Sequence, residues 1–155
     1  MKKILYSIIL ILVYTQLYTC NKVENPSIEE SGISNKSTMK LKISIGNKSL
    51  SATLIDNITT QAFVKMLPLT MDMTELHNNE KYGHLSSKLP GKADKPGTIH
   101  AGDLMLWDAD YKCLVLFYKT FKSPYSYVKL GTVDKPDELE KLLGSSNVKI
   151  KFELE

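Results

Sequence analysis

The sequence predicts a mainly β fold, a closed barrel of about eight strands with two short helices. Apolar and polar residues alternate along several segments with the two-residue period of a half-buried strand. The first and last of these segments, residues 40–45 and 147–155, are both long and amphipathic. Pairing them would remove two exposed sheet edges, so the pattern favours a closed barrel over a two-sheet sandwich.

Residues 98–118 are predicted to form the central hairpin, and they contain the only tryptophan, Trp107. Successive side chains of a strand point to opposite faces, and here both faces are apolar. Leu104 and Leu106 alternate with Met105 and Trp107, while Leu114, Leu116 and Tyr118 alternate with Cys113, Val115 and Phe117. Both strands are therefore expected to be buried on two sides. Residues 108–110 suit a tight turn, because Asp bonds readily to its own backbone.

The other predicted strands follow from the alternating pattern. They cover residues 40–45, 48–55, 69–76, 127–133 and 147–155. Residues 77–98 contain Gly and Pro turn signals and are predicted to be a long, partly structured connection. Residues 119–126 are predicted to be a second connection. Long ordered loops often carry function, so the first connection is a candidate region for a site.

Two short helices complete the prediction. The first covers residues 59–67, with capping residues at 56–57 and Pro68 as its end. The second runs from Asp134, as the cap, to Gly144, with proline and acidic residues in its first turn. Both have apolar residues at helical spacing, which indicates one face packed on the core.

Residues 1–19 have the layout of a bacterial secretory signal, a basic start followed by a short apolar core, and Cys20 comes next. A cysteine in this place resembles the lipobox of bacterial lipoproteins, in which the cysteine is acylated and becomes the first residue. An ordinary cleaved signal and an uncleaved anchor are the alternatives, although the core is short for a membrane span. Residues 20–38 are polar and predicted to be a flexible tether, followed by one domain over residues 39–155. We therefore expect a lipoprotein anchored to a membrane of the bacterial cell envelope, facing the periplasm or the exterior.

The charge balance argues against a nucleic-acid partner. The chain carries 20 basic and 17 acidic residues, and removal of Lys2 and Lys3 with the signal leaves a nearly neutral domain. Every basic residue is lysine. Arginine, the usual residue for bidentate recognition of phosphates and bases, is absent.

No catalytic or metal-binding motif stands out in the sequence. The possible metal ligands are His77, Glu80, His84 and His100. Their spacing matches no standard zinc pattern, so hydrogen-bonding histidines are expected, and neither a metal nor a cofactor is predicted. Asp103 precedes a buried strand and is expected to shape the strand start rather than act as a general base. Cys113 is expected to be a small buried residue rather than a reactive thiol.

The candidate binding residues are mostly aromatic. They come from the long connection, the central hairpin and the connection that follows it, and they are Tyr82, His84, Tyr118, Tyr125 and Tyr127. Tyrosine combines an apolar ring with a polar tip, which suits a half-open groove. Glu80, Lys81 and Lys119 are candidates for charges at the rim of that groove, with a solvated surface as the alternative.

Several ordered motifs resemble a known group of proteins. They are Ile45-Gly-Asn, Leu67-Pro-Leu-Thr70, Glu80-Lys-Tyr-Gly-His84, Leu89-Pro90, Ile99-His-Ala-Gly-Asp103, Leu114-Val-Leu-Phe-Tyr118, Ser123-Pro-Tyr-Ser-Tyr127 and Lys129-Leu-Gly131. Over residues 39–155 the chain is similar to small bacterial proteins with a cyclophilin-like fold, most of them uncharacterised. The resemblance implies a cyclophilin-type barrel of about eight strands capped by two helices.

The resemblance carries no catalytic residue to this chain. Prolyl isomerisation by true cyclophilins centres on a pocket arginine, and lysine does not reproduce its planar guanidinium. The expected function is therefore binding of a small molecule or an extended peptide, without catalysis, by a lipid-anchored envelope protein. The alternatives are a peptidyl-prolyl cis-trans isomerase with a divergent site, an unrecognised enzyme and a purely structural role in binding a partner protein.

Overall fold

The computed structural model describes residues 38–155 of the chain. The predicted signal over residues 1–19, the predicted lipidation site Cys20 and the predicted tether as far as residue 37 lie outside the described residues. Within residues 38–155, no helix has both the length and the apolar character that a membrane crossing requires.

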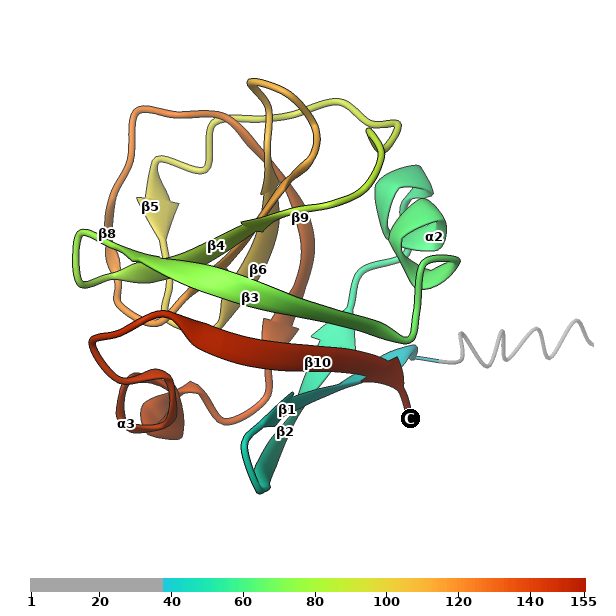
Figure 1. Cartoon of the computed structure of the whole chain (residues 1–155). Coiled ribbons are helices and arrows are strands. Elements are labelled where there is room, and N and C mark those ends of the chain that lie inside the picture. The colour runs from blue at the N-terminus through green and yellow to red at the C-terminus, as the bar shows by residue number, and fades with distance from the viewer. Residues whose placement is uncertain (1–37) are drawn as a thin grey trace, which may run out of the picture. The chain divides into compact units, whose positions relative to one another are not determined.

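Eight antiparallel strands form a closed barrel (Figure 1). They are β1 (Lys40–Ile45), β2 (Lys48–Leu54), β3 (Leu69–Leu76), β4 (Glu80–His84), β6 (Asp103–Trp107), β7 (Cys113–Phe117), β9 (Tyr127–Val133) and β10 (Val148–Leu154). Around the barrel they follow the order β1–β10–β3–β4–β7–β6–β9–β2. Ile43 of β1 lies opposite Phe152 of β10, so the first and last strands close the barrel as the sequence predicts.

The barrel interior is filled by alternate residues of its strands. In the central hairpin the fully buried interior residues are Leu104, Leu106, Leu114 and Leu116. The residues that alternate with these leucines belong to a second apolar cluster on the opposite face of the same strands. They are Met105, Cys113, Val115 and Phe117. The prediction that this hairpin is buried on two sides is therefore confirmed, with Trp107 at its exposed end.

Helix α2 (Ile58–Val64) packs against the end of the barrel where β3 begins (Figure 1). It starts after Asn57, whose side chain accepts a hydrogen bond from the N–H of Thr60 at 2.8 Å. This contact satisfies one of the free N–H groups of the first helical turn. Phe63 turns inward and meets the edge of Phe152, with the ring centroids 6.3 Å apart. The helix is therefore fixed by both its cap and its buried ring.

Helix α3 (Leu139–Leu143) follows a 3-10 turn, η1 (Pro136–Glu138), and leads into β10. The prediction that Asp134 caps this helix is wrong. Its carboxylate instead accepts hydrogen bonds from Lys40 at 2.8 Å and from Thr53 at 2.6 Å. These two contacts hold the pKa of Asp134 below its ordinary value. Asp134 therefore joins β1 and β2 and is not available as a cap.

Strand β4 is the main departure from the predicted elements. The sequence predicts a connection over residues 77–98, but part of it forms a full barrel strand between β3 and β7. The inward positions of β4 hold Lys81 and Gly83, so the strand lacks the usual apolar alternation. At Gly83, a Cβ atom would lie 2.9 Å from the Cε of Met71. The absent side chain therefore makes room for the methionine of the neighbouring strand.

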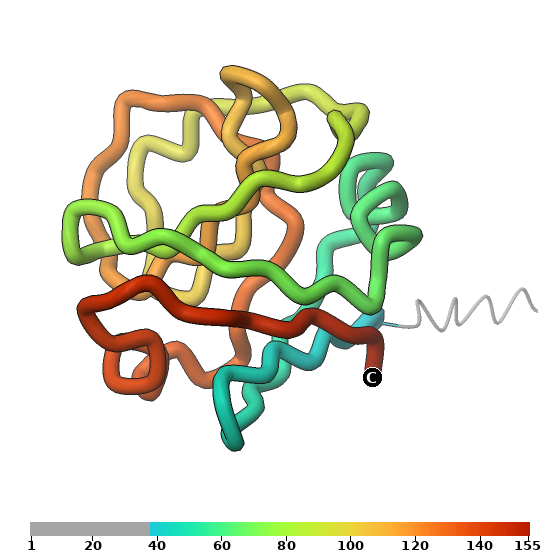
Figure 2. Tube along the Cα trace, viewed as in Figure 1, coloured from blue at the N-terminus to red at the C-terminus, as the bar shows by residue number. Residues whose placement is uncertain are grey.

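Two very short strands lie at the end of the first predicted connection and within the second. β5 (Thr98–Ile99) and β8 (Phe121–Lys122) pair with each other in a separate two-stranded sheet. Figure 2 shows the chain segments around β5 and β8 running alongside each other. They cover part of the outer face of the barrel and create the surroundings of the site described below.

Candidate ligand-binding site

A second apolar cluster lies on the outer face of the barrel. Its buried members are Ile99, Met105, Cys113, Val115, Phe117 and Tyr127, and Tyr82 and Phe121 pack against them. The strand residues among them alternate with the leucines that fill the interior. Phe117 lies at the centre, with its ring centroid 5.7 Å from that of Phe121 and 5.5 Å from that of Tyr127. A second, smaller apolar core therefore lies on the outer face of the barrel, where β5 and β8 cover β6, β7 and β9.

A cavity of about 480 Å³ opens beside this outer cluster. Strand β4 lines one side, and residues 121–125 line the other. Its buried lining residues Cys113, Val115 and Tyr127 come from β7 and β9, so the apolar cluster forms the floor. The volume lies within the range of about 300–1,000 Å³ that is usual for small-molecule sites.

The alternation of β4 places three chemically different side chains along the cavity. The cross-strand pairs with β7 are Glu80 with Phe117, Tyr82 with Val115, and His84 with Cys113. Directly opposite residues in antiparallel strands have Cβ atoms about 4.5–5.5 Å apart. A carboxyl group, a phenol and an imidazole therefore stand in a row at the edge of an apolar floor.

Aromatic rings form the exposed rim of the cavity. Trp107 is 36% exposed and Tyr125 is 59% exposed. Their rings meet edge to face, with centroids 6.4 Å apart. Tyr82 and His84 make a similar contact at 6.0 Å. Exposed aromatic rings around a concave surface are typical of binding sites, because their faces are free to pack on a ligand.

Glu80 is an uncompensated acid in this cavity. Burial, together with a smaller effect of the nearby Glu75 carboxylate, raises the pKa of Glu80 to about 7. Among residues 38–155, no side-chain ion pair or hydrogen bond reaches its carboxyl group. Near neutral pH the group is therefore present in both forms, and it is free to accept a donor from a ligand.

The other titratable groups of the floor are held neutral. Burial raises the pKa of the Cys113 thiol to about 11, and the charges of Asp110 and Glu80 add to this effect. Burial also raises the pKa of Tyr127. A protonated, buried thiol is a poor nucleophile. Cys113 therefore acts here as an apolar floor residue.

Asn79 is a lining residue that the sequence analysis did not single out. Its backbone is fully used, since its N–H donates to Leu76 at 3.2 Å and its carbonyl accepts from Tyr118 at 2.9 Å. Its side-chain Oδ1 is buried and has no hydrogen-bond partner in the described part of the chain. A buried acceptor without a partner is unfavourable. No sequence signal distinguishes this asparagine from its neighbour Asn78.

The structure brings four of the five predicted site residues together. Tyr82, His84, Tyr125 and Tyr127 all line the cavity. Tyr118 lies apart from them: it is buried with the interior core, and its hydroxyl donates to the Glu75 carboxylate at 2.9 Å. Lys81, which is predicted to lie at the rim, is also not part of the cavity, because its side chain is fully buried inside the barrel.

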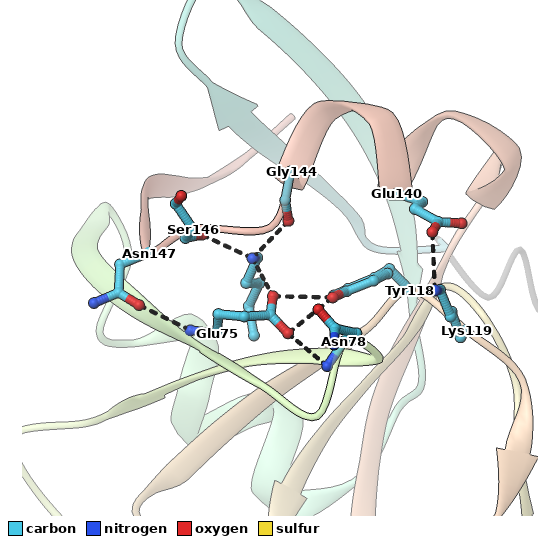
Figure 3. A network of polar contacts seen from close by, with 9 residues as sticks. Glu75, Asn78, Tyr118, Lys119, Glu140, Gly144, Ser146 and Asn147 are labelled. Atoms are coloured by element: carbon cyan, nitrogen blue, oxygen red, sulfur yellow. Dashed lines mark hydrogen bonds and ion pairs between the residues drawn. The ribbon is translucent and has the colours of Figure 1, made fainter.

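Figure 3 shows Glu75 in a polar network with Tyr118 and with the chain segment from Gly144 to Asn147, and the cation of this network is Lys81. The Lys81 ammonium pairs with Glu75 and donates to the carbonyls of Gly144 and Ser146, each at 2.8 Å. Burial opposes ionisation of Glu75, but the contacts from Lys81 and Tyr118 outweigh it and lower the pKa of Glu75. All three N–H donors of the Lys81 ammonium have acceptors, so the network stabilises the fold and leaves no donor for a ligand.

Asp103, the candidate general base, has structural partners. The buried carboxylate of Asp103 accepts from the N–H of His100 at 2.9 Å and pairs with Lys129 at 2.6 Å, at the start of β6. In the described part of the chain, no three His, Cys, Asp or Glu side chains lie close enough to hold a metal ion.

Comparison with known proteins identifies the fold in solved structures. The hypothetical protein AF2241 from Archaeoglobus fulgidus, determined in solution, is 16% identical, with a TM-score of 0.57 over 75% of this chain and 94% of that chain. The structure of McbB in complex with tryptophan is 9% identical, with a TM-score of 0.54 over 73% of this chain and 44% of that chain. This chain thus matches less than half of the length of McbB.

Two further comparisons concern the sequence itself. Among curated proteins, no significant match is found. A family model described as the cyclophilin-like family matches residues 43–153, which is most of the described barrel. The resemblance predicted from the sequence motifs is confirmed, and the chain belongs to the cyclophilin-like family.

Proposed function

We propose that this protein is a lipid-anchored protein of the bacterial cell envelope whose barrel binds a small molecule without catalysis. One observation carries the binding proposal. The outer cavity of about 480 Å³ has an apolar floor, an aromatic rim and an unpaired acid, Glu80. A mostly apolar cavity with few convergent polar groups is the usual form of a small-molecule site.

The cavity favours a small molecule over an extended peptide. A peptide that binds by strand addition needs a free sheet edge, and the eight barrel strands form a closed ring. A peptide could still insert one apolar side chain between Tyr82 and Tyr125. The solved complex of McbB with tryptophan supports the expectation that a chain containing this fold can accept a small aromatic ligand.

The absence of catalysis is proposed from the lining residues. Cys113, the thiol in the cavity, is held protonated by its raised pKa. The lining also contains a histidine and a serine, His84 and Ser123, which could act as a base and a nucleophile. No hydrogen bond joins these two side chains. The chain also has no arginine to take the place of the one that true cyclophilins use.

The anchor is proposed from the sequence of the N-terminus. A signal-like segment followed by Cys20 is typical of a bacterial lipoprotein. The test is incorporation of a labelled fatty acid in a Gram-negative or Gram-positive host that processes lipoproteins. Cys20→Ser should abolish the label and Cys113→Ser should retain it, since these are the two cysteines of the chain. Equal labelling of both variants would rule out acylation at Cys20.

Binding in the cavity is tested on the full chain isolated from its native envelope. Native mass spectrometry should detect a small molecule that is released on denaturation. Tyr82→Ala and Tyr125→Ala each remove one aromatic wall and should reduce the bound fraction several-fold. Ile58→Ala, an exposed change on α2 outside this cavity, is the control. Unchanged occupancy in both tyrosine variants would place the ligand elsewhere.

A further inference from the structure

We propose that the ligand of the outer cavity carries a protonated amine beside an aromatic or other apolar group, and that the Glu80 carboxylate is the partner of the ammonium. This inference rests on the proposed function, because it names the chemistry of the ligand for the same cavity. The position of Glu80 and the aromatic lining of the cavity support it.

Glu80 differs from the neighbouring acids in having no partner. Glu75 pairs with Lys81 inside the barrel, and Asp103 pairs with Lys129 at the start of β6. No such cation reaches Glu80 within residues 38–155, although the strand directs its side chain to the cavity beside Phe117. A carboxylate removed from water is stabilised by a cation and hydrogen-bond donors. An ammonium group in the cavity would supply both.

The remaining lining fits the same ligand. The rings of Tyr82, Trp107 and Tyr125 offer faces that attract a cation as well as an apolar group. A ligand carboxylate would instead meet the negative charge of Glu80, and a ligand without donors would leave the Glu80 carboxylate unsatisfied.

The charges around Glu80 define how binding depends on pH. Besides Glu80, the titratable residues that line the cavity are His77, Tyr82, His84, Cys113, Lys122, Tyr125 and Tyr127, and the charge of Glu75 acts on Glu80 from the neighbouring strand β3. Lys122 is exposed at the rim, and Glu75 opposes ionisation of Glu80. The pKa of Glu80 is about 7, so the carboxylate is available at about pH 8 and largely protonated at about pH 5.5. Ammonium binding should therefore weaken in acid and release a proton.

The test uses three matched probes on the full chain in detergent. Phenethylamine carries an ammonium, 2-phenylethanol replaces it with a hydroxyl, and 3-phenylpropionate replaces it with a carboxylate. Calorimetric titration gives the affinities. The fluorescence of Trp107 reports whether the probe enters the cavity, because it is the only tryptophan of the chain and it lines this site.

Phenethylamine is expected to bind about tenfold or more tightly than 2-phenylethanol at about pH 8, as one charge-assisted contact implies. 3-Phenylpropionate should bind most weakly. Glu80→Gln should reduce phenethylamine to the affinity of the alcohol and leave the alcohol unchanged. Glu140→Gln is the matched control, because Glu140 pairs with the exposed Lys119 outside the cavity. In the unaltered chain, lowering the pH to about 5.5 should weaken phenethylamine alone, a readout that needs no variant.

The outcomes separate this inference from the proposed function. If phenethylamine and 2-phenylethanol bind equally at about pH 8, with the same response of Trp107, the cavity is a ligand site but the ammonium inference is wrong. Preference for the carboxylate probe would overturn the inference in the same way. If none of the probes binds or alters Trp107 fluorescence, the ammonium inference and a small aromatic ligand in this cavity are both rejected.

Discussion

Glu80 and Lys81 are neighbours in the chain and lie on opposite sides of the barrel wall. Lys81 points into the barrel, is fully buried and pairs with Glu75. Glu80 points to the outer cavity and has no cation within residues 38–155. The alternation of one strand thus gives a closed polar network on one face and an unsatisfied acid on the other.

Glu80→Gln should stabilise the ligand-free protein at about pH 8 and have little effect at about pH 5. The folded pKa of about 7 is raised above the ordinary value of 4.5. The folded state therefore binds the proton more tightly, so stability is fully present below pH 4.5 and decreases as the pH rises towards 7. After allowance for partial exposure, the gain at about pH 8 is about 1 kcal/mol. Thermal unfolding at the two pH values, with Glu140→Gln as control, measures it; a loss of stability at pH 8 would contradict this environment.

Lys81→Met should destabilise the fold by about 3 kcal/mol, because it leaves the Glu75 carboxylate inside the barrel without its cation. The double variant Lys81→Met with Glu75→Gln should recover part of this loss, since it removes the uncompensated charge. Lys149→Met is the control, as Lys149 is exposed and lies 3.7 Å from Asp72. Denaturant unfolding gives the free energies of unfolding. An equal effect of the Lys81 and Lys149 changes would show that the buried pair contributes no more to stability than the exposed one.

The Glu75 pair also predicts an acid limit for stability. The folded pKa of Glu75 is lowered from its ordinary value of 4.5. Its contribution is therefore present above pH 4.5 and is lost as the pH falls through the lower folded value. In acid below pH 4.5, unfolding curves of the parent should approach those of Glu75→Gln. A constant difference between the two proteins across this range would be inconsistent with the assigned shift.

Asn57→Ala should cost about 1 kcal/mol or more, because Asn57 caps α2 through its Oδ1 and also donates to the carbonyl of Lys129 at 2.9 Å. Asn57→Asp retains the capping acceptor and loses the donor, so it should fall between the parent and the alanine variant. Asp56→Ala removes only the exposed hydrogen bond that Asp56 accepts from the Gln61 side chain, and it serves as the control. Chemical unfolding ranks the three variants. Equal stability of Asn57→Ala and Asn57→Asp would show that the capping hydrogen bond does not stabilise α2.

Prolyl isomerisation should not exceed the uncatalysed rate. The barrel belongs to the cyclophilin-like family, but the chain has no arginine. A peptide assay on a panel of Xaa-Pro substrates measures this directly, since the uncatalysed exchange takes tens to hundreds of seconds. Clear acceleration would restore the enzyme interpretation, and loss of that acceleration in His84→Ala would identify a replacement donor.

The barrel could be predicted largely because its strands carry the alternation that burial on one or two faces requires. Leu104 and Leu106 on one side of β6, and the amphipathic β1 and β10, are clear in the sequence. The sequence does not predict strand β4, because the inward positions of this strand hold Lys81 and Gly83. A lysine becomes an interior residue only when Glu75 and two carbonyls surround it, and those partners come from distant parts of the chain.

The site could be predicted only in part. Tyr82 and Tyr125 can be predicted because aromatic residues in long connections suit binding, and both line the cavity. Tyr118 follows the same alternation as Leu114 and Leu116, and this alternation already places it with the interior core. The missing partner of Glu80 has no signal in the sequence, because it depends on which cations the fold brings near.

The most direct test of the central claim is a crystal structure of the full chain isolated from its native envelope with its bound molecule. We expect density for a small molecule between Tyr82 and Tyr125, above Val115, with a nitrogen atom beside Glu80. Density for the bound molecule at any other place on the protein, with this cavity filled by solvent alone, would contradict it.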